Sequence, residues 1–533
     1  MRLIIYIVIL FALSSCGEHN TAIDIFEQKY RAMTGEESLD GFKDRLADLN
    51  RDIECEGILY DPLTRDSLLT GYYYGQFYDW DLYFEAIYQV YCGESKWCFK
   101  NLDAFFARQR ADGSIPRAFG MRDMSWTQQM FKPFVAQTAL LGMRQNADIE
   151  WLRGNIENIK RYLNSWYTLY DTDGNLLCVW ENCGHTGMDN QHHRVSGTFQ
   201  NESVDLNCYL YKEWLSLAEL AEMLGDLDGV HLYRAKAAGI ATVIDKLLWD
   251  EEDGIYYDRL VESGELKKVK GVSAFSPLYV GIASEDQAKR LVEEHLANPD
   301  EYWDNYGVRS LSKSEKGYDQ NGCTPPEAFC NWNGPTWMPF NYMFFHGLMD
   351  YGYTEYAEEL AYKCLDLVYL KNPVTREYYN STTGEGYGRN PFFGWSSLGY
   401  IMPIEFEMGG YTPSDIEERE MIPIVKDMLD GYTPQLTTQE DAEIVLNLAN
   451  SDVDRGIRYT YDQRRNIYAN IYVNNEKNHY IFTPLSSKAK IKITNVELVG
   501  CDETIKWSRD NDGLKVSCPK GQINELQYKI TIL

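Results

Sequence analysis

Basic residues are scarce in this chain of 533 residues. It contains 51 Lys and Arg against 80 Asp and Glu, which gives a formal net charge of −29. Because nucleic-acid recognition depends on concentrated positive charge on the protein, this balance argues against a nucleic-acid partner. The length exceeds what a single hydrophobic core usually serves, so we expect one large domain and a smaller one.

Long apolar runs are also lacking, apart from one at the N-terminus. Residues 3–13 follow a short basic start and are too few to span a bilayer as a helix, which is typical of a secretory signal. Residues 13–17 (LSSCG) then resemble a bacterial lipobox, in which cleavage before Cys16 leaves that cysteine to carry lipid. The alternative is an ordinary cleaved signal peptide. We therefore expect a signal peptide over residues 1–16 and a lipoprotein of the bacterial cell envelope, periplasmic or attached to the outer membrane, held to the membrane by its lipid alone.

The sequence has no CxxC pair and no HExxH motif, so a zinc site is not expected. Eleven cysteines remain besides Cys16, an odd number that cannot all pair. Since export permits disulfides, the pairs Cys92/Cys98 and Cys323/Cys330 are candidates.

Two other stretches bear on metal binding. Residues 171–175 (DTDGN) resemble a calcium loop only superficially, because Cys178 and Trp180 stand where further oxygen ligands would be needed. His185, His192 and His193 lie near Asp189, but histidines in a polar sugar site more often donate hydrogen bonds. We expect a turn at residues 171–175, no metal and no cofactor.

Alternating β-branched runs are few between residues 21 and 410, where helical patterns dominate. Apolar residues recur at three- and four-residue steps from Leu206 to Leu224, with Ser203 as a candidate cap and Gly225 as a candidate stop. Similar patterns cover residues 82–90, 128–143, 149–169, 230–249, 284–296, 337–351 and 354–369. This succession predicts an all-α array of helical hairpins over residues 21–410.

The pattern changes after residue 410. Pro413, Pro423 and Pro434 interrupt a charged region, and short strand-like runs follow at residues 467–473, 488–494 and 504–507. Asp512-Gly513 is typical of a hairpin turn between two strands. We predict a small β-sandwich domain over residues 430–533.

Two loops far apart in the chain suggest a chemistry. Residues 180–190 and 376–384 each place a carboxylate among aromatic, Gly and Asn residues. Hydrolysis of a glycosidic bond needs two carboxyl groups, one to protonate the leaving oxygen and one to activate water on the opposite face of the sugar. Aromatic residues make up 14% of the chain, with 40 Tyr and 13 Trp, and indoles and phenols suit stacking on sugar rings, although most of these residues serve the core. Trp80 and Asp81, within residues 75–84, offer the same mixture of ring and carboxylate.

Five further segments carry a family resemblance. In chain order they are residues 80–84 (WDLYF), 109–116 (QRADGSIP), 203–207 (SVDLN), 248–258 (LWDEEDGIYYD) and 275–283 (FSPLYVGIA). Together they resemble the clan of inverting glycosidases that includes glycoside hydrolase family 63, the mannosylglycerate hydrolases and the trehalases of family 37, over residues 71–404. The resemblance implies a mainly α fold, with a six-hairpin (α/α)6 barrel over residues 21–410, and inverting hydrolysis of an α-linked glucoside or related oligosaccharide.

The same resemblance implies roles for individual residues. Asp189, in residues 187–190 (GMDN), matches the general acid, and Glu377 matches the general base. The nearby acids Glu181, Glu385 and Asp205 compete for both roles, and the resemblance decides for Glu377 over Glu385. The segments that line the family's sugar pocket imply substrate contacts for Trp80, Asp81, Gln109, Asn190, Asp205, Trp332, Gly334, Trp337 and Trp395. We expect aromatic surroundings and a neighbouring negative charge to raise the pKa of Asp189, and inversion predicts a carboxyl separation of about 6.5–9.5 Å.

Three departures from the family pattern concern substrate choice. Asn333 replaces an arginine, Ser381 replaces a proline, and residues 183–186 lengthen the loop of the acid. The first removes a bidentate guanidinium, and the last is placed to reshape the aglycone side.

Other functions compete with this interpretation. A trehalase or a mannosylglycerate-type hydrolase is the nearest, a sugar-binding lipoprotein without turnover is the rival of another class, and a helical polysaccharide lyase is the third. Retention of both Asp189 and Glu377 argues against a pure binder, which needs neither a proton donor nor a base. The sequence indicates no oligomeric state.

Overall fold

The computed structural model describes residues 22–72, 76–120, 125–322, 330–388 and 392–410, together with 452, 457–461, 466–471, 479–489, 491–499, 501, 504–518 and 526–533. The signal segment with Cys16, the three prolines at 413, 423 and 434, and Cys323 lie outside the described residues.

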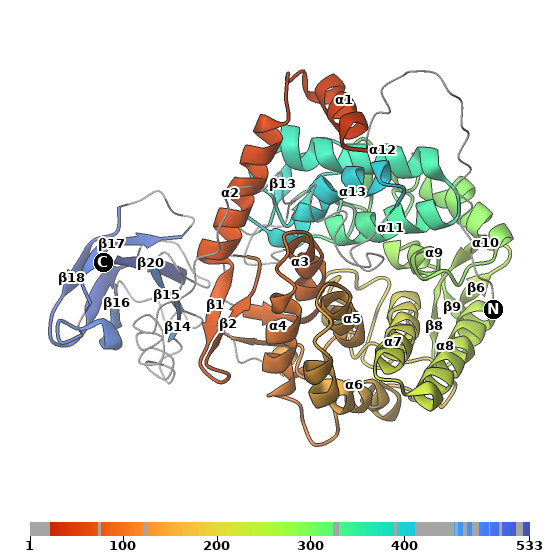
Figure 1. The fold of residues 1–533 in the computed structure, drawn as a ribbon, viewed down its shortest axis with the longest axis horizontal. Helices are drawn as coiled ribbons and strands as arrows, with labels where there is room; N and C mark the ends of the chain where they lie inside the picture. Colours follow the sequence, from red (N-terminus) through yellow and green to blue (C-terminus); the bar gives the residue numbers. More distant parts are fainter. Residues whose placement is uncertain are drawn as a thin grey trace.

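Six helices form a closed ring. Each contacts the next, and the last contacts the first. In order they are α3 (Asp79–Tyr91), α5 (Val135–Gln145), α7 (Val204–Met223), α9 (Ser276–Val280), α11 (Met338–Asp350) and α13 (Leu398–Glu407). The other described helices lie outside this ring: α1 (Ala22–Thr34), α2 (Asp40–Glu56), α4 (Lys96–Phe106), α6 (Ile149–Leu169), α8 (Leu227–Leu248), α10 (Glu285–Arg290) and α12 (Thr354–Leu365). From α2 onward, outer and inner helices alternate along the chain, so the predicted (α/α)6 barrel is confirmed (Figure 1).

Burial separates the inner from the outer helices. Every residue of α3 is buried, including three carboxylic acids, and α11 is buried from Met338 to Leu348. A helix that is apolar on all sides belongs in the interior, whereas α6 presents a polar face to solvent. The ring therefore surrounds a continuous core, and the loops that lead into the inner helices can form a binding site.

Several helices with a clear apolar period were predicted close to their observed bounds. The expected helix over residues 149–169 coincides with α6, and the one over 284–296 with α10 and the π-helical turn that follows it. The helix expected from residue 128 begins only at Val135, because Pro133 disfavours helical backbone in the residue before it. Helices α1, α2, α4, α9 and α13 were not predicted.

The expected cap of α7 was half right. Gly225 has the positive φ of +76° that ends a helix. Ser203 stands at the N-terminal position but makes no capping hydrogen bond; its hydroxyl donates to Oδ2 of Asp258 at 3.0 Å.

Short antiparallel strands lie in the loops. The pairs are β1 (Ile58–Asp61) with β2 (Asp66–Leu69), β3 (Gln76–Tyr78) with β4 (Ala118–Gly120), β6 (Trp249–Asp250) with β7 (Ile255–Tyr256), β10 (Trp303–Asp304) with β11 (Gly307–Val308), and β12 (Tyr378–Tyr379) with β13 (Gly386–Tyr387). A three-stranded sheet contains β5 (Asn201–Glu202), β8 (Asp258–Leu260) and β9 (Leu266–Lys267).

The C-terminal part is a sandwich of two antiparallel sheets with its own apolar core, as predicted. One sheet has the order β14 (Ile457–Tyr461), β15 (Asn466–Ile471), β20 (Leu526–Ile532), β17 (Ile493–Leu498), and the other β16 (His479–Phe482), β19 (Leu514–Ser517), β18 (Trp507–Arg509). Asp512-Gly513 lies in the hairpin turn between β18 and β19, as expected. The strand predicted over residues 488–494 is wrong, since β17 begins only at Ile493.

The candidate disulfide between Cys92 and Cys98 is contradicted, because both thiols are free. The Cys92 thiol contacts Oδ1 of Asn50 on α2, at 3.9 Å, while Cys98 on α4 packs against α5 at Gly142. Among the described helices, none is both long and apolar enough to cross a bilayer.

Candidate active site

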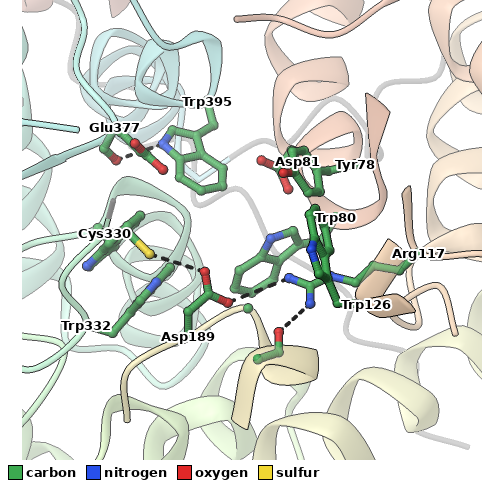
Figure 2. Close-up of a pocket in the computed structure, with 13 residues that line it drawn as sticks. Tyr78, Trp80, Asp81, Arg117, Trp126, Asp189, Cys330, Trp332, Glu377 and Trp395 are labelled. Carbon is green, nitrogen blue, oxygen red and sulfur yellow. Dashed lines mark hydrogen bonds and ion pairs between the residues drawn. The ribbon is translucent and has the colours of Figure 1, made fainter. Parts of the chain in front are cut away.

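A cavity of about 400 Å³ lies where the segments entering α3, α11 and α13 meet the loop after α6. Figure 2 shows Asp189 and Glu377 approaching it from different sides. Its lining residues are Tyr78, Trp80, Asp81, Arg117, Trp126, Gly184, Gly187, Asp189, Cys330, Trp332, Trp337, Glu377 and Trp395. Two carboxylates almost two hundred residues apart in sequence thus share one aromatic cavity.

Asp189 lies at the accessible side of the cavity, with 49% of its side chain exposed. Nη2 of Arg117 is 3.7 Å from its Oδ1, and the Cys330 thiol is 3.3 Å from its Oδ2 (Figure 2). Among the described residues, the charged group in contact with Asp189 is thus a cation, Arg117, while the aromatic rings of the cavity surround the pair. The sequence could not show this contact, because Arg117 comes from a distant loop.

The loop of Asp189 is held by buried contacts. Nε2 of His185 lies 2.6 Å from the carbonyl oxygen of Met130, and its Nδ1 accepts from the backbone N–H of Glu181 at 3.3 Å. Burial lowers the pKa of His185 well below its ordinary value, so the ring stays neutral. His185 is fully buried against Trp166 and positions the loop, whereas the sequence had suggested that it donates hydrogen bonds to sugar.

Glu377 immediately precedes β12 and is 8% exposed. Its carbonyl oxygen accepts from Nε1 of Trp395 at 2.9 Å, and its N–H donates to the carbonyl of Tyr387 at 3.2 Å. Gly388, with φ +88°, leaves room for it, because a Cβ there would lie 2.4 Å from Cβ of Glu377. The competing Glu385 is exposed and does not line the cavity.

Buried charges lie beneath the cavity. Nζ of Lys132 binds Oδ1 of Asp79 at 2.7 Å, with neither side chain exposed, and lies 5.0 Å from the centre of a ring of Trp80. Burial raises the pKa of Asp81 to about 8, reinforced by the charges of Asp79 and Glu377 and opposed chiefly by that of Lys132. Asp81 is thus a protonated carboxyl at neutral pH, able to donate a hydrogen bond.

Indole rings form one wall of the cavity. Trp332 and Trp337 stack with ring centres 3.5 Å apart and planes 6° apart, and Trp337 also stacks on Tyr378 at 4.6 Å. Trp80 and Trp395 meet edge to face at 6.4 Å. Rigid aromatic faces beside polar groups suit the apolar face and hydroxyl rim of a sugar ring.

Comparison with known proteins identifies the domain that carries this cavity. Residues 73–396, more than half of the chain, match the family described as the mannosylglycerate hydrolase MGH1-like glycoside hydrolase domain. The chain belongs to this family of glycoside hydrolases. Residues 449–532, which include the sandwich, match a second family, the alpha-L-fucosidase C-terminal domain.

The match to each curated relative covers only part of that relative's length. The chain is 28% identical to a cytosolic neutral trehalase of Kluyveromyces lactis over 255 residues, which are 41% of this chain and 33% of that protein. It is 25% identical to a periplasmic trehalase of Escherichia coli over 267 residues, 48% of this chain and 43% of that protein. The chain therefore spans less than half the length of these curated relatives.

A solved structure supports the fold of the glycoside hydrolase domain. A family 63 mannosylglycerate hydrolase from Thermus thermophilus, in complex with glucose, is similar with a TM-score of 0.55 at 19% identity. The similarity covers 68% of this chain and 99% of that one. At this identity the likeness establishes the barrel alone.

In this glycoside hydrolase domain, seven of the residues named from the sequence line the cavity together. They are Asp189, Glu377, Trp80, Asp81, Trp332, Trp337 and Trp395. Asn190 and Gly334 lie just behind them: Oδ1 of Asn190 accepts from the N–H of Trp332 at 2.8 Å, and the carbonyl of Gly334 accepts from Gln320 at 3.0 Å. These two residues fix the loop of residues 331–337, which carries Trp332 and Trp337, and do not themselves line the cavity.

Gln109 and Asp205 lie elsewhere, so the substrate contacts expected for them do not match their positions. Nε2 of Gln109 donates to the carbonyls of Gly113 and Asn158, both at 2.9 Å. Asp205 is fully buried and accepts from Nε1 of Trp180 at 3.0 Å and from Nη2 of Arg194 at 3.2 Å. Both are polar residues whose hydrogen bonds are used within the barrel.

Several lining residues of the cavity were not predicted from the sequence. Arg117 directly follows the segment at 109–116, and that adjacency was the available signal. Its Nη1 donates to the carbonyl of Gly184 and to Oε1 of Gln129, the latter at 3.2 Å. Tyr78 and Trp126 stack at 5.8 Å on the same side of the cavity.

The replacement of an arginine by Asn333 leaves a residue that does not line the cavity. Nδ2 of Asn333 donates to the carbonyl of Asn190 at 3.3 Å, which ties the loop of residues 331–337 to the loop that carries Asp189. The hydroxyl of Ser381 donates to Oδ2 of Asp304 at 2.6 Å. Within the described residues, no group of three or more His, Cys, Asp or Glu side chains is arranged to hold a metal ion.

Proposed function

We propose that this protein hydrolyses an α-linked glycoside with inversion, with Asp189 as general acid and Glu377 as general base. The single observation that carries the proposal is that the two carboxylates face one aromatic cavity from separate loops, in a chain of a glycoside hydrolase family (Figure 2). Inverting hydrolysis requires such a pair on opposite sides of one sugar ring.

In the proposed reaction, the carboxylate of Glu377 takes a proton from a water molecule as the water oxygen attacks the anomeric carbon. The bond from that carbon to the glycosidic oxygen breaks, and Asp189 delivers its proton to the departing oxygen. The products are a sugar of inverted anomeric configuration and the free aglycone. Burial of Glu377 and the hydrogen bond from Trp395 to its backbone would hold the base in place.

The remaining lining residues would bind the sugar. Trp332, held rigid by its stacking on Trp337, offers an aromatic surface, and the protonated carboxyl of Asp81 offers a donor to a hydroxyl. Because a general acid has to carry a proton, the contact between Arg117 and Asp189 has to loosen when substrate binds.

The test is a panel of α-linked glucosides and mannosides, including trehalose and mannosylglycerate, with product anomers followed by NMR. Protein lacking residues 1–16 is compared with Asp189→Asn and Glu377→Gln. We expect the β-anomer to be released first and both variants to lose turnover. Sugar binding by all three proteins, with turnover by none of them, would instead support the sugar-binding lipoprotein.

We also propose, from the sequence, that the chain is an exported lipoprotein anchored at Cys16. A Cys16→Ala variant of the full chain, expressed in a bacterium, is expected to move from the membrane fraction to the soluble fraction. Mass spectrometry of the N-terminal peptide checks the lipid, and an unlipidated, membrane-free wild-type chain would contradict the proposal.

A further inference from the structure

A second cavity adjoins the acid side of the proposed active site. It has a volume of about 300 Å³ and is lined by Asn182, Cys183, Gly184, His192, Val195, Ser196 and Gly197. Gly184 lines both this cavity and the catalytic one, so the two share a wall. We call the second one the loop cavity, because its lining comes from the loop that carries Asp189.

The position of the loop cavity relative to Asp189 indicates which part of a substrate it would hold. A general acid stands next to the glycosidic oxygen, between the sugar that is attacked and the group that leaves, while the base stands across the sugar ring. Asp189 is half exposed, whereas Glu377 is buried. The leaving group therefore departs past Asp189, on the side where residues 182–197 form the loop cavity.

The lining of the loop cavity suits a sugar. Cys183 and Val195 are buried and give an apolar floor. At the rim, His192 and Ser196 are exposed, and the hydroxyl of Ser196, which accepts from Nζ of Lys267 at 2.6 Å, still has a hydrogen to donate. An apolar surface with a few convergent polar groups is typical of small-ligand sites, and about 300 Å³ is at the lower end of their volumes.

The loop is also fixed well enough to hold a ligand. Arg117 donates to the carbonyl of Gly184, and the thiol of Cys183 contacts the carbonyl of Asp189 at 3.4 Å. Oδ1 of Asn182 accepts from the N–H of His185 at 3.1 Å. A site whose walls are already ordered loses less entropy on binding.

We propose that the loop cavity is an aglycone subsite for a further sugar unit, so that the substrate is an α-linked oligosaccharide of three or more units rather than a disaccharide or a sugar acid. This inference rests on the proposed function, because it takes Asp189 as the acid. It assigns residues 183–186, which lengthen the acid loop, to the choice of substrate length.

The test compares α-glucosyl disaccharides with the trisaccharides of the same linkage. We expect kcat/KM of the wild type to be about tenfold higher for the trisaccharide, a difference typical of one modest additional contact. Ser196→Trp, which fills the loop cavity, is expected to bring the ratio of the two kcat/KM values down to about 1, and His192→Ala to lower it in the same direction. The ratio is measured on a single preparation, so partial misfolding of a variant does not affect it.

Thr198→Trp is the matched control. Thr198 is exposed and two residues from Ser196, but it does not line the loop cavity, so its variant is expected to keep the wild-type ratio. A wild-type ratio near 1 that neither Ser196→Trp nor His192→Ala changes would overturn the subsite while leaving the proposed hydrolysis intact. Absence of turnover on every glycoside would overturn the proposed function, and the subsite with it.

Discussion

Gly187 lies directly against the indole of Trp80. A Cβ built on Gly187 would lie 2.5 Å from Cζ2 of that ring, closer than real atoms approach, and the φ of Gly187 is +86°. The acid loop therefore reaches its position beside Trp80 only because residue 187 has no side chain.

Gly187→Ala is expected to lower kcat/KM by about tenfold or more, because the loop has to move away from Trp80 and takes Asp189 with it. Gly174→Ala is the matched control: Gly174 has a φ of +76°, but open space surrounds its missing side chain. The control carries the backbone strain without the clash, so equal activity losses in the two variants would contradict this explanation.

The pH dependence of activity is expected to reflect the ionisation of Asp81. Burial raises its pKa from 3.8 to about 8 in the folded protein, so it holds its proton up to that pH. Above pH 8 it ionises among Asp79, Glu377, Lys132 and Arg117, loses its donor and adds a negative charge near Glu377. We expect kcat/KM to fall as the pH rises through about 8, and Asp81→Asn, which resembles the protonated form, to make that fall smaller. Lys132, whose pKa burial lowers to about 8, titrates in the same range and accounts for the fall that remains.

The same shift has a consequence for stability. Since the folded-state pKa of Asp81 lies above its ordinary value, the folded form binds the proton more tightly. The contribution of Asp81 to the free energy of unfolding is fully present below about pH 4 and is lost as the pH rises through about 8. Denaturant titrations of wild type and Asp81→Asn at pH 6 and pH 9 check this; a wild-type loss between these pH values that is no larger than that of the variant would exclude it.

Arg117 is expected to support catalysis by holding the acid loop. Arg117→Lys keeps a charge near Asp189 but cannot bridge Gly184 and Gln129 as the guanidinium does, so we expect kcat to fall by about ten- to a hundredfold. Steady-state kinetics measure this, with Arg153→Lys, on the exposed side of α6, as the control. Wild-type kcat in Arg117→Lys would show that the bridge is not needed.

Asp205 is expected to matter for stability rather than for substrate binding. It shares the buried guanidinium of Arg194 with Asp258, whose Oδ2 lies 2.9 Å from Nη1. Asp205→Ala leaves that interior charge with one partner and is expected to lower the free energy of unfolding by about 3–5 kcal/mol. Chemical denaturation measures the loss, and a variant of unchanged stability but raised KM would restore the substrate contact first inferred from the sequence.

The sequence predicted the cavity residues that lie within short, recognisable segments. Trp80, Asp81, Asp189 and Glu377 each stand in such a segment, and all four line the cavity. Arg117 was missed because its contact with Asp189 joins two loops that only the closed barrel brings together.

The sequence also could not distinguish a carboxylate that stabilises the barrel from one that lines the cavity. Asp205 stands in a segment as characteristic as that of Asp189, yet its oxygens serve Trp180 and Arg194 inside the barrel. Among the helices, α6 has one apolar face, so its apolar residues recur with a clear helical period. Helix α13 is buried on almost all sides, so its sequence shows no such period.

The most direct measurement of the central claim is the anomeric configuration of the first product, followed by proton NMR during hydrolysis of an α-linked glucosyl trisaccharide. We predict initial release of the β-anomer, with kcat lowered by about a hundredfold or more in both Asp189→Asn and Glu377→Gln. Initial release of the α-anomer, or full activity in either variant, would contradict the assignment of these two residues as the acid and base of an inverting hydrolase.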